Sequence, residues 1–384
     1  MDFVGVDIGA SGTKVISQQG RIDKFDNNAV VLDKDAVVRF DPYDDTLDSA
    51  LWVKISKSGQ SQRFPISIMY GQMADRQSSV NIRPSVQQKK YVQDINYASI
   101  ITAAAISRIK FGTPEKITLY VAVPPAEIYK ASEAFNEELV GDFTVEFPKY
   151  NGGTTVNIKV EEVKCEQESV MAMLSFFFSI NGTMKEASKK FMEGYTLGVN
   201  IGASTSDLVV TKNGQYQEKT GRTIAIGGNM ARDRLIELVD EEYEFELPFE
   251  EAEKVMATGR LTVGNTLVDV SNLVRQAKDT LAEELVVKMD SYFKSVNIPI
   301  KLLRGIVMSG GGSLAGKFTG EDGKEITTTP PMSEFVADRL KGWCDTLDVA
   351  EYGDEARLAD LKGLFLKAQL DSKIKEREKE QFKI

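Results

Sequence analysis

The stretch GVDIGASGTK, residues 5–14, is nearly repeated as GVNIGASTSD at residues 198–207. Each copy begins with a short apolar run that contains β-branched residues and continues into a turn of glycine and small hydroxyl residues. Such a run predicts a buried strand, and the turn predicts a tight connection to a second strand. We therefore expect one strand-turn-strand unit to occur twice, in two domains of similar fold.

The composition of both turns predicts binding of an anion. Such a turn exposes backbone N–H groups, and glycine lets the backbone come close to a phosphate. Lys14 adds a positive charge at the position where a phosphate would lie. Further donors are the hydroxyl groups of Ser11, Thr13, Ser204 and Thr205. Two matching turns predict a pair of phosphate loops that hold a nucleotide between two domains.

Asp7 stands at the predicted end of the first strand, directly before the turn. Proteins usually bind Mg²⁺ through one or two carboxylates, together with water and substrate oxygens. Asp7 is therefore the candidate that would hold a Mg²⁺ ion through its water shell.

Composition and charge exclude several classes of function. The chain has 384 residues, which suits two domains, and its formal net charge is −10. It contains no histidine, which excludes His-based triads and His metal sites. An acidic chain without a basic block is not expected to bind nucleic acid directly, so any contact with DNA would need an adaptor protein.

We expect a cytoplasmic protein that does not bind a membrane. Asp2 and Asp7 interrupt the N-terminal apolar run, which argues against a signal peptide. The apolar stretch Ser169–Ile180 is too short to span a bilayer. Cys165 and Cys344 are far apart, and we expect buried thiols in a reducing cytosol.

Predicted strands and helices alternate along the chain, which indicates an α/β fold. Strands are expected at Phe3–Ile8, Thr13–Ser17, Ile117–Val123, Val156–Val163, Tyr195–Ile201, Ser206–Thr211 and Leu303–Met308. Helices are expected at Tyr97–Ile109, Glu168–Ile180, Met230–Val239, Pro248–Ala257 and Asn272–Ser295. Short mixed segments from Asp33 to about Lys90 predict an inserted subdomain.

Two other phosphate motifs compete with this interpretation. The first turn is not a P-loop, because Val15 follows Lys14 where that motif requires Ser or Thr. Gly310, Gly312 and Ala315 match the dinucleotide pattern G-x-G-x-x-A after a predicted strand. A Rossmann domain would place that pattern in its first strand-helix unit, whereas here it lies late in the chain.

The two turns resemble the phosphate motifs of the actin-like ATPases, the superfamily that also contains DnaK-type chaperones and sugar kinases. The first motif resembles Asp7 to Lys14, and the second resembles Gly198 to Asp207. The resemblance adds to the expected phosphate contacts the residues Gly9, Gly12, Gly202 and Ala203.

Further landmarks follow in the order that the superfamily has. Ile306–Ser313 is similar to the adenosine motif, which implies nucleotide contacts from Gly310, Gly311, Gly312 and Ser313. Glu168–Ala172 resembles a connecting helix whose first residue, Glu168, would polarise the attacking water. Glu253, beside Lys254, stands where relatives reach the ribose and base. Ile226–Asn229 resembles a Gly-Gly turn, and Ala359–Gly363 resembles the second connecting helix.

This resemblance implies duplicated domains of the actin and ribonuclease-H type, with a nucleotide cleft between them. Domain I would comprise residues 1–190, with an inserted subdomain at about 33–90 and returning C-terminal helices at about 355–384. Domain II would comprise residues 191–354, with an inserted subdomain at about 222–300.

Within the superfamily, the chain looks most similar to ParM-like plasmid-segregation actins. Its length, the segment Tyr70–Ala74 before the helix at Tyr97, and Glu168 carry this similarity. The implied function is a filament-forming ATPase that uses ATP, or GTP, with Mg²⁺. The implied partners are further copies of the chain and a ParR-like DNA-binding adaptor.

Two alternatives remain open on the sequence alone. A sugar or acetate-type kinase shares the first loop, although we find no motif for its substrate-facing aspartate. A non-hydrolysing scaffold is the other, because Asn200 stands where the superfamily usually has an aspartate that helps to hold the metal. An amide there should weaken Mg²⁺ binding, and Asp207 could carry part of the role.

Overall fold

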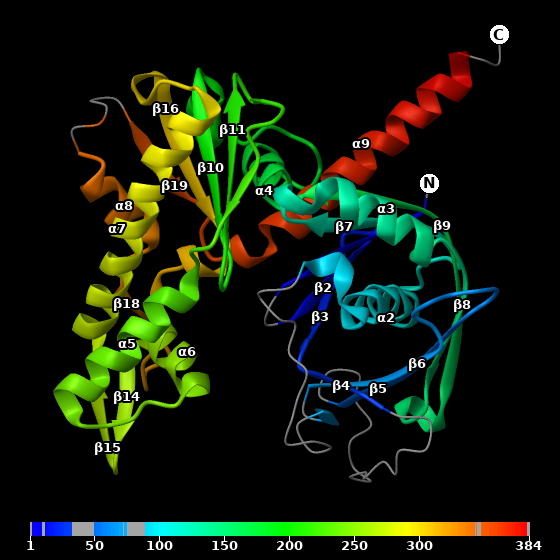
Figure 1. Ribbon diagram of the computed structural model, residues 1–384, viewed down its shortest axis with the longest axis horizontal. Coiled ribbons are helices and arrows are strands. Elements are labelled where there is room, and N and C mark those ends of the chain that lie inside the picture. The colour runs from blue at the N-terminus through cyan, green and yellow to red at the C-terminus, as the bar shows by residue number, and fades with distance from the viewer. Residues whose placement is uncertain are drawn as a thin grey trace. The chain divides into compact units, whose positions relative to one another are not determined.

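The computed structural model describes residues 2–9, 12–32, 50–71, 73–74, 89–341, 343 and 347–381. Contacts divide the chain into two compact units (Figure 1). The first comprises Met1–Ser175, Ile180–Gly182 and Asp360–Ile384, and the second comprises Phe176–Ser179 and Thr183–Ala359. The domain and subdomain ranges expected from the sequence stay a prediction.

The first unit contains, among the described residues, a nine-stranded sheet in the order β3-β2-β1-β7-β9-β8-β5-β6-β4. Its strands are β1 (Phe3–Ile8), β2 (Thr13–Ser17), β3 (Ile22–Phe25), β4 (Ala29–Val31), β5 (Ala50–Lys57), β6 (Ile66–Gly71), β7 (Lys116–Val123), β8 (Gly141–Phe147) and β9 (Thr154–Gln167). The strands β3, β2 and β1 are antiparallel neighbours, whereas β1, β7 and β9 run parallel. The described strands between residues 33 and 90 extend this same sheet beyond β8.

The second unit repeats this pattern in a sheet of order β12-β11-β10-β16-β19. Its strands are β10 (Tyr195–Ile201), β11 (Ser206–Lys212), β12 (Gln215–Tyr216), β16 (Leu303–Ser309) and β19 (Asp348–Glu351), and β13 (Arg222–Ile224) pairs with β11. Here too the first three strands are antiparallel and the last three are parallel. The duplication expected from the repeated stretch is therefore confirmed.

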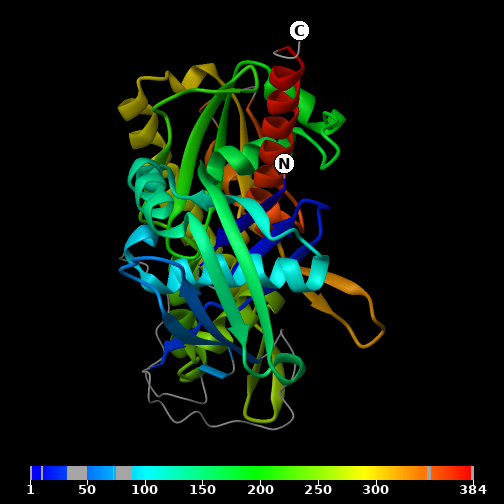
Figure 2. The ribbon, with the colours of Figure 1, turned by 90° about the vertical axis from the view of Figure 1, so that its right-hand side faces the viewer.

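Helices cover both sheets. The first unit holds α2 (Asp94–Phe111), α3 (Ile128–Leu139), most of α4 (Glu168–Phe177) and nearly all of α9 (Ala359–Gln381). The second holds α5 (Gly228–Tyr243), α6 (Phe249–Thr258), α7 (Ser271–Val296) and α8 (Met332–Arg339). Figure 1 shows α7 running beside α5 and α8, with which it is in contact. Figure 2 shows the hairpin of β17 (Gly316–Thr319) and β18 (Glu325–Thr329) standing out from the second unit. A further two-stranded sheet consists of β14 (Arg260–Val263) and β15 (Thr266–Asp269).

Each unit has its own hydrophobic core. In the first, α2 is apolar on most sides and buried along nearly all of its length, so that Ile101 packs in one cluster with Val121 of β7. In the second, Val274 of α7 packs in one cluster with Leu197 of β10. Both phosphate-loop candidates therefore extend from strands that are buried on both faces, which fixes the backbone on either side of each turn.

The chain passes out of the first unit within α4 and returns to it at the start of α9. These helices touch backbone to backbone inside the first unit. A Cβ atom added to Gly363 of α9 would lie 2.0 Å from the carbonyl oxygen of Met171 in α4. Glycine is needed there because no side chain fits between the two helices.

The C-terminal helix α9 is also held to the sheet by charge. The Asp371 carboxylate accepts hydrogen bonds from the Tyr120 hydroxyl at 2.9 Å, from Lys164 at 2.7 Å and from Lys367 at 2.6 Å. Burial alone would raise the pKa of Asp371, but these hydrogen bonds hold that pKa below its ordinary value. The carboxylate is therefore ionised at neutral pH and ties α9 to β7 and β9.

Replacing Gly363 with alanine should destabilise the protein, although alanine is ordinarily favoured over glycine inside a helix by about 0.5–1 kcal/mol. The new methyl group would overlap the Met171 carbonyl, and moving the helices apart should cost about 1–3 kcal/mol. Urea unfolding followed by circular dichroism measures the change, with Ser372→Ala further along α9 as the control. A gain in stability would show that α4 and α9 do not touch at Gly363.

Candidate functional site

The repeated stretch builds the same turn in both units. In the first, Asp7 on β1 lies opposite Lys14 on β2, and the Gly9 N–H donates to the Gly12 carbonyl at 3.0 Å. Ser11 lies outside the described residues.

In the second unit, Asn200 on β10 lies opposite Asp207 on β11, and the Gly202 N–H donates to the Thr205 carbonyl at 2.9 Å. The two turns thus have the same register and the same closing hydrogen bond. Asn200 occupies the position of Asp7, and Asp207 occupies the position of Lys14.

The first turn is supported by a buried side chain that no sequence motif marks. Asn27 donates from Nδ2 to the Gly9 carbonyl at 2.7 Å, and its Oδ1 accepts a hydrogen bond from the Thr13 hydroxyl. Both Asn27 and Thr13 are fully buried. This differs from our assignment of the Thr13 hydroxyl as a phosphate donor, because that hydroxyl is directed into the protein and stabilises the turn.

Beside this turn, Asp7 and Lys14 form an ion pair. Lys14 Nζ lies 2.6 Å from Asp7 Oδ2, and Asp7 is only 4% exposed. Burial would raise the pKa of Asp7, but the charges of Lys14 and Lys90 keep it below the ordinary value. Burial would likewise lower the pKa of Lys14, yet Asp7 raises it. Both groups therefore carry their charge at neutral pH.

Glu168, the predicted water-positioning residue, is the first residue of α4 and follows β9 directly. Its carboxylate oxygen Oε1 is ion-paired with Lys90 Nζ, from the short 3-10 helix η1 (Lys90–Val92). Nothing in the local sequence marks Lys90, because it is 78 residues away from Glu168 and belongs to no motif. The structure brings these two charges together, and Lys90 is also close enough to act on the pKa of Asp7.

The second turn is supported by backbone N–H groups at the N-terminus of α5. The Gly228 N–H donates to the Gly202 carbonyl at 2.9 Å, and the Asn229 N–H donates to the Ala203 carbonyl at 2.6 Å. In a trans peptide the N–H points away from the carbonyl of the preceding residue. The N–H groups of Ala203 and Ser204 are therefore directed away from α5, as an anion-binding turn requires.

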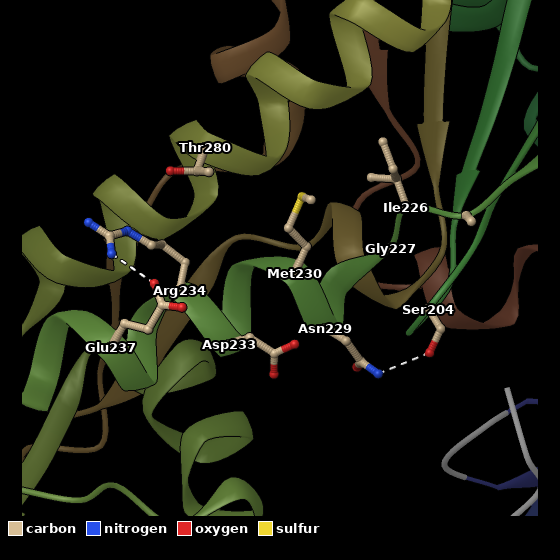
Figure 3. Close-up of a pocket in the computed structure, with 10 residues that line it drawn as sticks. Ser204, Ile226, Gly227, Asn229, Met230, Asp233, Arg234, Glu237 and Thr280 are labelled. Carbon is tan, nitrogen blue, oxygen red and sulfur yellow. Dashed lines mark hydrogen bonds and ion pairs between the residues drawn. The ribbon is translucent and has the colours of Figure 1, made fainter. Parts of the chain in front are cut away.

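A pocket of about 430 Å³ adjoins this second turn (Figure 3). Asn229 Nδ2 donates to the Ser204 hydroxyl at 2.9 Å at its edge. Its lining includes Ser204, Ile226, Asn229, Met230, Asp233 and Thr280. The Ser204 hydroxyl can still donate its own hydrogen, since it only accepts from Asn229.

The glycines after β16 pack on the end of β10. Gly310 has a φ of +84°, and a Cβ atom there would lie 2.4 Å from the Ile201 carbonyl oxygen. At Gly312 a Cβ atom would lie 2.4 Å from the Ile201 side chain. The Ser313 hydroxyl donates to the Gly310 carbonyl at 2.8 Å, which closes a short turn. Close packing against the end of β10, directly before the second turn, thus explains Gly310 and Gly312 without a ligand.

The dinucleotide-binding alternative at this loop is wrong. After Ser309 the chain forms the 3-10 helix η6 (Gly311–Ser313) and then the hairpin β17–β18. The G-x-G-x-x-A fingerprint requires an α-helix whose N-terminus faces the pyrophosphate. No such helix follows Ser313 in this described part of the chain.

Two family descriptions match the sequence. Residues 5–170 match the N-terminal domain of actin-like proteins, and residues 199–317 match the C-terminal part of the archaeal MreB-like actin homologues. The chain is an actin-like protein. No curated protein sequence matches it.

Solved structures of other actin-like proteins share this fold over nearly the whole chain. The archaeal actin homologue Ta0583 has a TM-score of 0.70 and 16% identity, covering 97% of this chain and 100% of its own. Alp7A has a TM-score of 0.70 and 17% identity, covering 98% of both chains. Bacillus thuringiensis ParM with ATP has a TM-score of 0.66 and 16% identity, covering 97% of this chain and 99% of its own. The expected actin-like fold with two domains is confirmed.

In this actin-like chain, the adenosine-type loop is also close to α6. Glu253 of α6 forms an ion pair of 3.7 Å with Arg357, whose Nε lies 3.3 Å from the position of a Cβ atom at Gly311. Both charged side chains are more than half exposed, so the pair contributes little to stability. Glu253 is therefore free to exchange this partner for a ligand.

Asn200 is buried, and its Oδ1 accepts a hydrogen bond from the Ser309 hydroxyl at 3.4 Å. Asp207 accepts one from the Thr223 hydroxyl at 2.6 Å. Opposite residues are thus an acid and a lysine in the first unit, and an amide and an acid in the second. Among the described residues, no group of three acidic or sulfur side chains could enclose a metal ion.

The structure also bears on the expectations for the cysteines and for membrane-spanning helices. Burial raises the pKa of Cys165 to about 12, so its thiol stays protonated and is no nucleophile; Cys344 lies outside the described residues. Within the described ranges, every helix is either too short or too polar to cross a bilayer.

Replacing Asn27 with leucine should destabilise the first turn. The change leaves the Gly9 carbonyl and the Thr13 hydroxyl without their buried partner, at about 1–3 kcal/mol for each group. Urea unfolding of Asn27→Leu, Thr13→Val and the double variant measures both effects. Because Thr13→Val removes the hydroxyl that Asn27→Leu would strand, the double variant should lose less stability than the sum. Strictly additive losses would contradict the Thr13–Asn27 hydrogen bond.

Proposed function

We propose that this actin-like protein is a nucleotide-dependent, filament-forming ATPase that hydrolyses ATP or GTP as it polymerises. The observation that carries the proposal is the pair of matching turns, each held rigid by its own support. The first has the ion pair of Asp7 and Lys14 beside it, and the second has backbone N–H groups directed away from α5. The solved structures of Ta0583 with ADP and of ParM with ATP support a nucleotide as the ligand.

The substrate would be the Mg²⁺ complex of the nucleotide. Asp7 fits the metal-facing role because it is ionised and buried, and its contact with Lys14 uses one carboxylate oxygen, Oδ2. Mg²⁺ on a nucleotide needs only one or two protein carboxylates, since phosphates and water complete its shell. Lys14 would then exchange Asp7 for a phosphate oxygen, and the Asn200 amide would add a neutral ligand for the water shell.

Glu168 would position the water that attacks the terminal phosphate. Such a transition state needs alignment and charge stabilisation more than it needs a strong base. The carboxylate stands on the first turn of α4, where burial and the Lys90 ion pair restrict its motion. Gly12 and Ala203 would supply backbone donors to the phosphates, whereas Gly9 and Gly202, whose own N–H groups close the turns, would let the backbone come close to them. Glu253, Gly310, Gly311 and Ser313 would contact the base and ribose.

Filament growth would depend on nucleotide binding, and hydrolysis would weaken the filament. We propose a role in moving or segregating plasmid DNA, in the manner suggested by the structural likeness to ParM. The net charge of −10 argues for a basic, ParR-like adaptor between the filament and DNA. Retention of DNA by the purified chain alone at physiological salt would contradict this part.

Light scattering after addition of Mg-ATP or Mg-GTP tests the central proposal. Scattering should rise with nucleotide and fall again as phosphate is released, and the Asp7→Ala variant should give no rise. The competing function is a sugar or acetate-type kinase, which would give a flat trace and release ADP only when its acceptor is present. Electron micrographs of the same samples would show whether the scattering comes from filaments.

The Glu168→Ala variant separates assembly from chemistry. It should bind nucleotide and polymerise, because the two turns and Asp7 are unchanged, but release phosphate about 100-fold more slowly. Its filaments should persist long after those of the wild type have disassembled. The control is Glu161→Gln, an exposed carboxylate on the preceding strand, which should match the wild type. Phosphate release from Glu168→Ala at the wild-type rate would show that Glu168 is only a helix-start acid.

A further inference from the structure

Lys90 is a partly buried lysine that contacts the Glu168 carboxylate. Its side chain is 19% exposed, and the Glu168 side chain that it contacts is 14% exposed. Bringing two charges out of water costs free energy that the ion pair itself only partly returns. A partly buried ion pair of this kind, close to Asp7, is therefore a candidate for a role beyond stability.

The backbone of Lys90 is fixed on both sides. Its N–H donates to Glu127 Oε2 at 2.8 Å, and its carbonyl accepts a hydrogen bond from Asn96 Nδ2 at 2.9 Å. Glu127 belongs to the 3-10 helix η2 (Pro125–Glu127) after β7, and Asn96 belongs to the first turn of α2. Two separate elements thus set the point from which the Lys90 side chain reaches Glu168.

The charge of Lys90 is permanent under any ordinary condition. Burial would lower its pKa, but Glu168 and Asp7 raise that pKa well above the ordinary value for lysine. The ammonium group contacts Glu168 through Oε1, which restricts rotation of the carboxylate about its side-chain torsions. A carboxylate held by one oxygen can still accept a hydrogen bond from water at the other.

We propose that Lys90 is a positioning residue for nucleotide hydrolysis, which acts by holding the Glu168 carboxylate in the orientation that aligns the attacking water. The inference rests on the proposed function, because it assigns Lys90 a role only through Glu168. Lys90 does not bind the nucleotide in this scheme. Its removal should therefore slow hydrolysis and leave nucleotide affinity unchanged.

The test compares Lys90→Met, Lys90→Arg and the wild type under conditions that saturate the protein with Mg-ATP. Single-turnover phosphate release should be about 10- to 100-fold slower in Lys90→Met, since a small misalignment of a reacting group has effects of that size. Lys90→Arg keeps the cation and should recover most of the rate. The matched control is Lys89→Met, which removes the exposed neighbouring lysine and should hydrolyse at the wild-type rate.

A double-variant cycle with Glu168→Gln tests whether Lys90 acts through Glu168. If it does, Lys90→Met should not slow hydrolysis further once Glu168 is glutamine. Nucleotide affinity and the thermal midpoint of each variant are measured on the same samples. Wild-type affinity together with a slow rate in Lys90→Met separates positioning from a structural role.

Several outcomes would overturn the inference. A wild-type hydrolysis rate in Lys90→Met would remove the role of Lys90 and leave the proposed function standing. Additive slowing in the double variant, or failure of Lys90→Arg to restore the rate, would show that Lys90 does not act through Glu168. Loss of nucleotide binding in Lys90→Met would make Lys90 a binding or structural residue. Nucleotide binding without any turnover in the wild type would overturn both this inference and the proposed hydrolysis.

Discussion

In the first unit, the placement of the residues around the first turn depends on the close contact between α4 and α9 at Gly363. Because Gly363 has no side chain, α9 can rest on the Met171 carbonyl of α4, and the distance between these helices is fixed by backbone atoms. Glu168 stands less than one turn before Met171, and the buried Asp360 three residues before Gly363 is close enough to raise the pKa of Lys14. The same contact therefore sets the position of Glu168 and the charge environment of the first turn.

The duplicated turns show how one backbone motif can serve two chemical roles. In the first unit the Asn27 side chain donates to the carbonyl of Gly9 in the turn. In the second unit the backbone at the N-terminus of α5 donates to the corresponding carbonyl, that of Gly202. The opposite pair Asp7 and Lys14 also differs in charge from Asn200 and Asp207. The first turn therefore has two charged side chains beside it, whereas the second offers backbone dipoles next to a buried amide and a buried carboxyl group.

The fold could be predicted from the sequence because its signals are local. The repeated stretch predicts both turns, and the buried strands and amphipathic helices have periodic patterns. The supports of the site could not be predicted in this way. Asn27 meets Gly9 across 18 residues, and Lys90 meets Glu168 across 78, so neither contact has a local pattern. The direction of the Thr13 hydroxyl likewise depends on Asn27, and no local sequence pattern indicates that these two residues are in contact.

Lys278 and Lys90 show that the chemistry of the partner, and not burial alone, decides the pKa of a lysine side chain. Lys278 of α7 donates to the Leu314 and Pro330 carbonyls and to the Thr329 hydroxyl, which holds the chain after the Gly310 loop. Its partners are neutral oxygens, so burial lowers the pKa of Lys278 to about 8. Lys90 faces a carboxylate, and its pKa moves in the opposite direction. As pH rises through 8, Lys278 loses one proton and hence one donor for its three acceptors, whereas the hold on Glu168 is unchanged. Alkaline pH should therefore loosen the segment that follows the Gly310 loop before it affects the Glu168 carboxylate.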